Sequence, residues 1–268
     1  MTDDVARRHA LRSTFNTAAE RYDRLRPRYP PALFDDLAAL AGLAEGSRVL
    51  EVGCGTGQAT CDLADRGYVV TALELGEELA ALAARRFAAV PNVEIVRADF
   101  ETWPLPSRPF DAVLFATSFH WLDPATRASR AAAAVRPGGA VATIRTHHVA
   151  GGTDAFFDDA QDCYLRWDPE SETRVYLTPG ADIPVDSEGL DELGSVELRR
   201  HEWEGTYSRE AYIELLLTYS GHIALAPENQ AGLLDCIGRL IEERYGGSIV
   251  KRYLFELFVA RLSEPAGA

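Results

Sequence analysis

Apolar residues up to position 145 follow two alternating patterns, short continuous runs and helically spaced repeats. Five runs have the length and composition of buried strands, at residues 47–52, 68–74, 93–99, 110–117 and 140–145. Four neighbouring segments repeat apolar residues three or four positions apart, as one helix face requires, at residues 31–43, 57–67, 76–90 and 123–139. This alternation predicts an α/β fold, with a doubly wound, mostly parallel sheet and helices on both of its faces.

The pattern changes after residue 146. A loop and an amphipathic helix are predicted from 147 to about 170, followed by a segment of weak pattern. We expect this region to cap the ligand edge of the sheet. Strands are predicted at 194–208 and 248–262, with helices at 208–219 and 228–245 between them. The last strand alternates apolar residues with a period of two, which favours an antiparallel member at the sheet edge.

A glycine-rich loop follows the first predicted strand. The segment EVGCGTGQAT at 51–60 has glycine at positions 53, 55 and 57. Open parallel sheets bind ligands beyond the carboxyl ends of their strands, and the first such turn usually contacts the ligand. The dinucleotide pattern Gly-x-Gly-x-x-Gly is not satisfied, because Gln58 stands where its third glycine would be. A nicotinamide oxidoreductase is therefore an alternative that this spacing disfavours.

Acidic residues end the first three predicted strands. Glu51 precedes the glycine loop, where a carboxylate would repel a pyrophosphate and attract an ammonium group. Glu74 ends the second strand, where an acid can accept hydrogen bonds from both hydroxyls of a ribose. Asp99 ends the third strand, where it could accept from an adenine amine, with Phe100 beside it to cover a ring. The three acids together indicate a ligand with an amino group, a ribose and an adenine.

These motifs resemble those of class I S-adenosylmethionine-dependent methyltransferases, in VLEVGCGTG, ALELGEE and RADFETWPLP. The segments YDRLRPRYP, TSFHWLDP and VRPGGAVA resemble the narrower type-11 branch, which includes trans-aconitate methyltransferase-like enzymes. The resemblance is strong over about residues 12–146. It implies a Rossmann-like, three-layer α/β/α fold whose seven-stranded sheet has its last strand antiparallel. It also implies S-adenosyl-L-methionine as cofactor, with Glu at 51 where many relatives have Asp.

Ten residues form the predicted cofactor-binding set, which combines this resemblance with the positions after each strand: Tyr22, Arg28, Glu51, Gly53, Gly55, Glu74, Leu75, Asp99, Phe100 and Ala116. In the segment YDRLRPRYP, an arginine can pair with a carboxylate of cofactor or acceptor, and a tyrosine face can meet a sulfonium cation. A surface loop held by its prolines is the alternative for that segment.

The acceptor side is predicted from residues that follow the fourth and fifth strands. His120 and His147 are candidate general bases, because an unperturbed imidazole titrates near pH 6.5. For His120, a structural or pocket-lining role is favoured over that of a base, because the resemblance places FHW in relatives expected to act on different acceptors. The predicted substrate-binding residues are Tyr29, Trp121, Arg145 and His148, among which Arg145 could anchor an acidic acceptor. A solvated loop is the alternative for both His147 and His148.

Composition restricts the classes of partner and ligand that the protein is expected to bind. The net charge of −14 disfavours nucleic acid, since non-specific affinity for it comes mainly from Lys and Arg. No segment is apolar enough to span a membrane or to serve as a signal sequence, so we expect a cytoplasmic protein. The four cysteines have no metal-site spacing and are expected to be reduced, and no metal is predicted. Aromatic residues after position 160 indicate a small, partly apolar organic acceptor.

The predicted organisation is a single methyltransferase domain over 1–268, as a monomer or homodimer. Residues 1–30 are expected to form a lid and 31–146 the cofactor-binding core. Residues 147–193 and 208–247 are expected to cap the substrate, and 194–207 and 248–262 to form the last two strands. The expected reaction methylates an O, N or C atom by in-line displacement. A cofactor-binding protein that does not methylate, such as a cyclase, is the alternative from another class.

Overall fold

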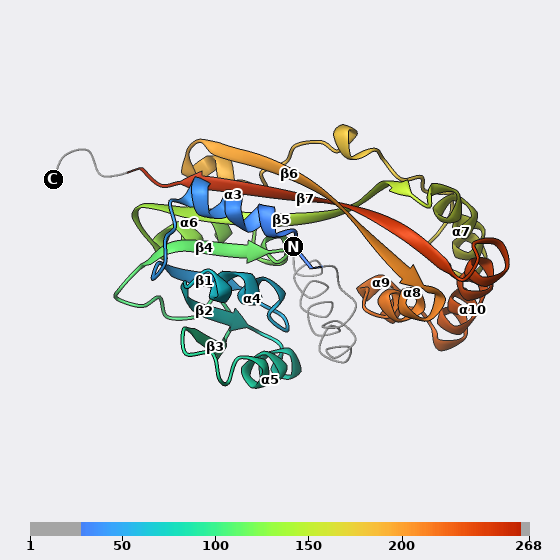
Figure 1. Ribbon diagram of the computed structural model, residues 1–268, viewed down its shortest axis with the longest axis horizontal. Coiled ribbons are helices and arrows are strands. Elements are labelled where there is room, and N and C mark those ends of the chain that lie inside the picture. Colours follow the sequence, from blue (N-terminus) through green and yellow to red (C-terminus); the bar gives the residue numbers. More distant parts are fainter. Residues whose placement is uncertain (1–27, 264–268) are drawn as a thin grey trace.

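The structure is a computed structural model that describes residues 28–263 (Figure 1). Its sheet has seven strands in the order β3-β2-β1-β4-β5-β7-β6. Five strands are parallel, and β7 is antiparallel to both of its neighbours. The strands are β1 (Arg48–Val52), β2 (Val69–Glu74), β3 (Val93–Arg97), β4 (Phe110–Ala116), β5 (Val135–Gly152), β6 (Val196–Ser208) and β7 (Ser248–Arg261). The predicted fold class is confirmed.

The helices cover both faces of this sheet and its far end. They are α3 (Pro31–Ala41), α4 (Gln58–Asp65), α5 (Glu77–Arg86), α6 (Arg127–Ala133), α7 (Asp154–Trp167), α8 (Arg209–Leu216), α9 (Ser220–Ile223) and α10 (Pro227–Arg244). Short 3-10 turns lie at Phe119–Trp121, Gly180–Asp182 and Leu190–Leu193. Among residues 28–263, no helix combines the length and the apolar character that a membrane crossing would need.

Two hydrophobic cores lie on opposite faces of the sheet, because successive strand residues point to opposite sides. Val49 of β1 joins the core that contains Leu33, Phe34 and Leu37 of α3. Leu50, the next residue, joins the core formed with α6 and the 3-10 turns. Local residues determine where α3 ends, because Gly42 caps its C-terminus in the left-handed conformation with φ 66°.

The strands β5, β7 and β6 are longer than the others and extend past them to α7, α8 and α10 (Figure 1). The prediction that a loop begins at residue 147 is wrong, because β5 continues to Gly152. Pairing with β7 supplies the backbone hydrogen bonds of this extension, with His148 opposite Tyr253. The sequence there lacks a strand pattern, so only the antiparallel partner determines its conformation.

Three further predictions need correction. The strand β7 is not at the edge, because β6 pairs with its outer side, and residues on both faces of β7 are buried. The helix expected to run to Gly138 ends at Ala133, and β5 already begins at Val135. The helix expected over 208–219 ends at Leu216, and the short helix α9 follows beyond that range.

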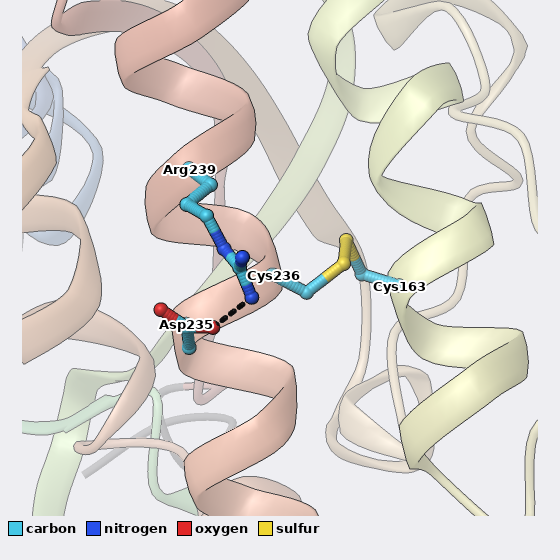
Figure 2. Close-up of a disulfide and its surroundings, with 4 residues drawn as sticks. All are labelled: Cys163, Asp235, Cys236 and Arg239. Carbon is cyan, nitrogen blue, oxygen red and sulfur yellow. Dashed lines mark hydrogen bonds and ion pairs between the residues drawn. A yellow bond between two sulfur atoms is a disulfide. The ribbon is translucent and has the colours of Figure 1, made fainter.

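The cysteine prediction is wrong for two of the four residues. Cys163 of α7 and Cys236 of α10 form a disulfide, with their Cα atoms 5.8 Å apart (Figure 2). The two helices pack side by side, and 73 positions separate the cysteines, so no sequence spacing reveals the pair. Cys54 and Cys61 are free. A disulfide is unusual in the reducing cytoplasm, which was the location expected from the sequence.

We expect reduction of this disulfide to lower the free energy of unfolding by about 2–4 kcal/mol, because the bond limits the freedom of the unfolded chain across a long loop. Urea unfolding with and without a phosphine reductant measures the change. The double variant Cys163→Ser/Cys236→Ser should lose the same amount and no longer respond to reductant, while Cys61→Ser should respond as the parent does. Equal unfolding midpoints of the parent in both conditions would contradict the prediction.

Candidate active site

A cavity of about 300 Å³ opens beyond the carboxyl ends of β1, β2 and β4. Eight of the predicted site residues line it: Gly53, Gly55, Glu74, Leu75, Phe100, Ala116, His120 and Trp121. They come from segments that are far apart in the sequence and meet because parallel strands end at one edge of the sheet. The volume and the mixture of apolar and polar walls are typical of a small-molecule site.

The glycine loop brings its backbone to the cavity. Gly53, Gly55 and Gly57 have φ angles of 73°, 59° and 92°, in the left-handed region that glycine adopts without strain. The amide of Gly53 donates to the carbonyl of Leu73 at 2.8 Å, which holds the loop against β2. A Cβ atom on Gly53 would lie 2.7 Å from Cβ of Ser118, and one on Gly57 would lie 2.2 Å from the Phe87 ring. Both positions require glycine, because a side chain at either one would collide with the neighbouring residue.

Glu74 connects the first two loops of the cavity. Its Oε2 accepts from the amide of Gly55 at 2.8 Å, and its Oε1 accepts from the amide of Gly76 at 2.8 Å. The side chain lines the cavity although it is only 8% exposed. A carboxylate held by two backbone donors is fixed in position, and each of its oxygens can accept more than one hydrogen bond.

Glu51 lies behind the loop and is not one of the residues lining the cavity. Its side chain is 1% exposed, and its Oε2 accepts from the hydroxyl of Thr60 at 2.6 Å. Burial raises the pKa of Glu51 to about 8, and the charge of Glu74 adds to the rise. The ligand-free protein therefore holds this carboxyl largely protonated at neutral pH. The sequence analysis expected a charged Glu51 carboxylate that attracts an ammonium group, and a protonated carboxyl does not carry that charge.

The raised pKa of Glu51 predicts a loss of stability with rising pH. Since the folded value of about 8 lies above the reference value of 4.5, the stability is complete below pH 4.5 and falls until the pH passes 8. We expect Glu51→Gln to remove on the order of 3 kcal/mol of this loss between pH 6 and pH 9. Urea unfolding at the two pH values measures it, with exposed Glu94→Gln as the matched control. Parallel pH dependence of parent and Glu51→Gln would refute the assignment.

Asp99 and Phe100 lie where β3 leads into the cavity wall. Oδ1 of Asp99 accepts from the amide of Glu101 at 3.0 Å, and Ala98 and Phe100 on either side of it line the cavity. The Phe100 ring is buried and packs edge-to-face on Phe115 at 5.6 Å. Phe100 therefore offers an apolar wall, while Asp99 is placed at its margin.

The segment after β4 forms the opposite wall. Thr117 has a φ of 58°, unusual for a residue with a β-branched side chain, and its amide donates to the carbonyl of Ile144 at 2.8 Å. The following 3-10 turn presents His120 and Trp121, whose ring centroids lie 4.8 Å apart. Desolvation, together with the charges of Arg145 and Arg127, lowers the pKa of His120 below its usual value. His120 is therefore neutral at physiological pH.

The structure does not bring the predicted residues of β5 to this cavity. Arg145 donates to the carbonyl of Asp186 at 2.7 Å. Nε2 of His147 lies 2.7 Å from Oε2 of Glu256, a fully buried carboxylate that Arg200 also binds. His147 is thus part of a hydrogen-bonded network between β5, β7 and β6, and it is not one of the residues that line the cavity.

His148 is buried beside the same strand. Its ring lies 4.5 Å from the Phe157 ring, edge-to-face, and 6.3 Å from the Tyr253 ring. Burial, with the charge of Lys251, lowers the pKa of His148 to about 2. Neither His147 nor His148 is the solvated loop residue that the sequence left as an alternative.

The three site residues predicted in the N-terminal segment have different outcomes. Tyr22 lies outside the described residues, and Arg28 is exposed. The Tyr29 hydroxyl lies 3.1 Å from Oγ1 of Thr117, and its ring packs on Phe34 and Phe255. Tyr29 therefore supports the wall after β4 from behind.

Sequence reasoning missed several cavity residues as specific contacts. Thr117 and Ser118 follow β4, and Tyr219 comes from the junction of α8 and α9, in the region expected to cap the site. The length of the capping segment and its aromatic content were visible in the sequence. The sequence did not show that Tyr219, among these aromatic residues, would reach the cavity.

Comparison with known proteins adds a family relationship. Residues 49–139 match a family described as a methyltransferase domain. An uncharacterized methyltransferase of Mycobacterium tuberculosis is 36% identical over 236 residues, which cover 87% of this chain and 88% of that protein.

Solved structures share the fold. A structure assigned as a type II methyltransferase, from Anaeromyxobacter dehalogenans, has a TM-score of 0.64 and 25% identity over 90% of this chain and 99% of that chain. Phosphoethanolamine N-methyltransferase 2 of Haemonchus contortus, solved with S-adenosylhomocysteine, has a TM-score of 0.52 and 16% identity, covering 93% of this chain and 58% of that one.

Proposed function

The chain belongs to the class I S-adenosylmethionine-dependent methyltransferases, and from this premise we propose that it methylates a small organic acceptor. The cavity carries this proposal. Its acceptor side combines His120, Trp121 and Tyr219, the last supplied by the helices that cap the sheet. Such an aromatic wall suits a small molecule. The net charge of −14 disfavours nucleic acid as the acceptor.

The cofactor site is proposed at the predicted positions. Glu74 would accept hydrogen bonds from the ribose hydroxyls, as the fixed carboxylate at the end of β2 permits. Leu75 and Phe100 would cover the adenine, and the bare backbone of Gly53 and Gly55 would admit the amino-acid part. Glu51 would act from behind the loop through its position, because its hydrogen bond with Thr60 joins the end of β1 to α4. Bound S-adenosylmethionine supplies an electrophilic methyl group.

The residues of the acceptor side would act mainly by positioning. Methyl transfer is an in-line displacement, which needs an aligned nucleophile in a site from which water is excluded. The neutral imidazole of His120 could hold a proton of the acceptor, but a wall role agrees equally with its place beside Trp121. His147 is bound to Glu256 and is no longer proposed as a base.

Narrower statements stay predictions. These are the trans-aconitate methyltransferase-like branch, the atom that is methylated, the monomeric or dimeric state and the cytoplasmic location. We also keep the division into a cofactor-binding core over 31–146 and a cap over 147–193 and 208–247, with β5 extending into the cap.

Transfer of labelled methyl groups tests the proposal. The purified chain is incubated with S-adenosylmethionine carrying tritium in its methyl group, in separate reactions with small-molecule, RNA, DNA and protein fractions of a cell extract. We expect label in the small-molecule fraction, accompanied by S-adenosylhomocysteine. Label confined to a macromolecular fraction would contradict the acceptor class. Cofactor binding without transfer to any fraction would favour the non-methylating alternative.

A further inference from the structure

Lys251 is the single lysine of the 268-residue chain, and it is buried. It lies near the start of β7 with 4% of its surface exposed. The other basic side chains of the protein are arginines and histidines. A lysine is seldom buried unless it is paired, because removing its charge from water is costly.

In the described part of the chain, the Lys251 ammonium has aromatic neighbours and no acidic partner. Nζ donates to the Tyr219 hydroxyl at 3.1 Å and lies 5.1 Å from the ring centroids of both Tyr219 and Tyr253. Within residues 28–263, no carboxylate oxygen lies within 4.0 Å of Nζ. Contact with ring faces compensates only part of the desolvation of a cation. Among the residues that the structure describes, the buried ammonium therefore has no carboxylate beside it as a counter-ion.

The titratable groups around Lys251 do not supply that counter-ion. Burial and the Lys251 charge lower the pKa of His222 to about 4 and that of His148 to about 2, so both imidazoles are neutral. Burial raises the pKa values of the tyrosines packed here, which keeps their hydroxyls protonated: Tyr164, Tyr212 and Tyr253. Asp168, the acid whose charge reaches His222, is engaged by Ser171 and by the amide of Glu170.

The buried ammonium adjoins the candidate active site. Tyr219, which accepts its hydrogen bond, also lines the cavity. In the sheet, the residues in register with Lys251 are Gly152 on β5 and Gly205 on β6, so neither directly paired residue has a side chain. Lys251 and the side chains around it therefore lie next to the acceptor side of the cavity, on the side away from the glycine loop.

We propose that Lys251, together with Tyr219, binds a negatively charged group of the methyl acceptor. One cation matches one negative charge, which favours a carboxylate. A phosphate carries about −1.5 to −2 at neutral pH and would keep an uncompensated charge here. The sequence assigned the anchoring of an acidic acceptor to Arg145, which is bound to Asp186 instead. This inference rests on the proposed methylation of a small organic molecule and names the class of that molecule.

The single lysine offers a direct spectroscopic test. Protein grown with lysine labelled with ¹³C at Cε and ¹⁵N at Nζ gives one side-chain signal. Full-length protein saturated with S-adenosylhomocysteine is titrated with acetate and phenylacetate, and with acetamide and phenylacetamide as uncharged matches, at constant ionic strength. We expect a saturable shift of the lysine signal with the carboxylates, and binding at least tenfold weaker for the amides.

Variants separate anion binding from structure. Lys251→Met should lose the preference for phenylacetate over phenylacetamide in calorimetric titration. It should also unfold several degrees higher, because an unpaired buried charge is removed. Arg252→Met, at the adjacent position of β7, where Arg252 pairs with Glu204, should keep the preference. Lys251→Arg should retain part of it.

The outcomes are distinguishable. No saturable shift with either carboxylate, equal binding of acids and amides, or a preference that survives in Lys251→Met would each overturn the role of Lys251. Lower thermal stability of Lys251→Met with an unchanged preference would assign the lysine a structural role. Failure of the parent protein to bind S-adenosylhomocysteine would instead contradict the proposed function, before any carboxylate is added.

Discussion

Replacing Glu74 with alanine is expected to weaken S-adenosylhomocysteine binding on the order of 100-fold, because hydrogen bonds to a charged acceptor contribute about 1.5–3 kcal/mol. Two effects act together. The variant loses the proposed acceptor of the ribose hydroxyls. It also removes the two carboxylate oxygens that accept hydrogen bonds from the amides of Gly55 and Gly76, each at 2.8 Å. Both loops lose that restraint. Calorimetric titration of parent and variant measures the change in affinity.

The controls for Glu74→Ala use the same region of the sheet. Glu94→Ala removes an exposed glutamate from neighbouring β3 and should bind as the parent does. Glu74→Gln keeps one carbonyl oxygen but places an amide donor against a backbone donor, so an intermediate affinity is expected. If folded Glu74→Ala bound S-adenosylhomocysteine within threefold of the parent, the ribose assignment would be wrong.

Replacing Gly53 with alanine is expected to lower the free energy of unfolding by about 2–5 kcal/mol and to weaken cofactor binding at least tenfold. The backbone φ of 73° costs an alanine about 1–2 kcal/mol. In addition, its Cβ would lie 2.7 Å from Cβ of Ser118, and overpacking costs about 1–3 kcal/mol. Relief would displace Ser118 and the turn that carries His120 and Trp121, so both walls of the cavity would change.

Gly46→Ala separates these two causes. Gly46 has a similar φ of 82°, but a Cβ atom there would have no neighbour within 4 Å. The variant should lose about 1 kcal/mol from backbone strain alone and bind the cofactor normally. Urea unfolding and calorimetry compare the two alanine variants. Equal losses of stability in both would show that contact with Ser118 contributes nothing.

The cofactor half of the molecule could be predicted largely from local signals. The strands β1 to β4 follow the apolar runs, and the acids and glycines lie where each strand ends. That regularity placed Gly53, Gly55, Glu74 and Phe100 at one edge of the sheet, and all four line the cavity. The burial of Glu51 was not predictable, because a residue's place before or behind a loop depends on its rotamer and on the helix that packs there.

The cap could not be predicted in the same way, because its structure depends on distant partners. Residues 146–152 become a strand only through pairing with β7. Cys163 meets Cys236 only because α7 packs on α10. His147 and His148 were grouped by their neighbouring positions, yet a strand sends adjacent side chains to opposite faces, so one meets Glu256 and the other Phe157.

Lys251 illustrates the same limit. Its sequence context, within an apolar strand, gives no sign of a ligand, and its burial is apparent only in the folded cap. Tyr219 became identifiable as a cavity residue for the same reason. Lys251 and Tyr219, which we propose to bind the acceptor, lie in this half of the chain, while the predicted cofactor motifs lie in the first.

Calorimetric titration of the full chain with S-adenosylhomocysteine, and with NADH as the control ligand, tests the central claim most directly. The account predicts saturable binding of S-adenosylhomocysteine with a dissociation constant of about 1 μM or below, equivalent to about −8 kcal/mol, and no heat of binding for NADH. Saturable binding of NADH alone would contradict the assignment of the cavity at the ends of β1, β2 and β4.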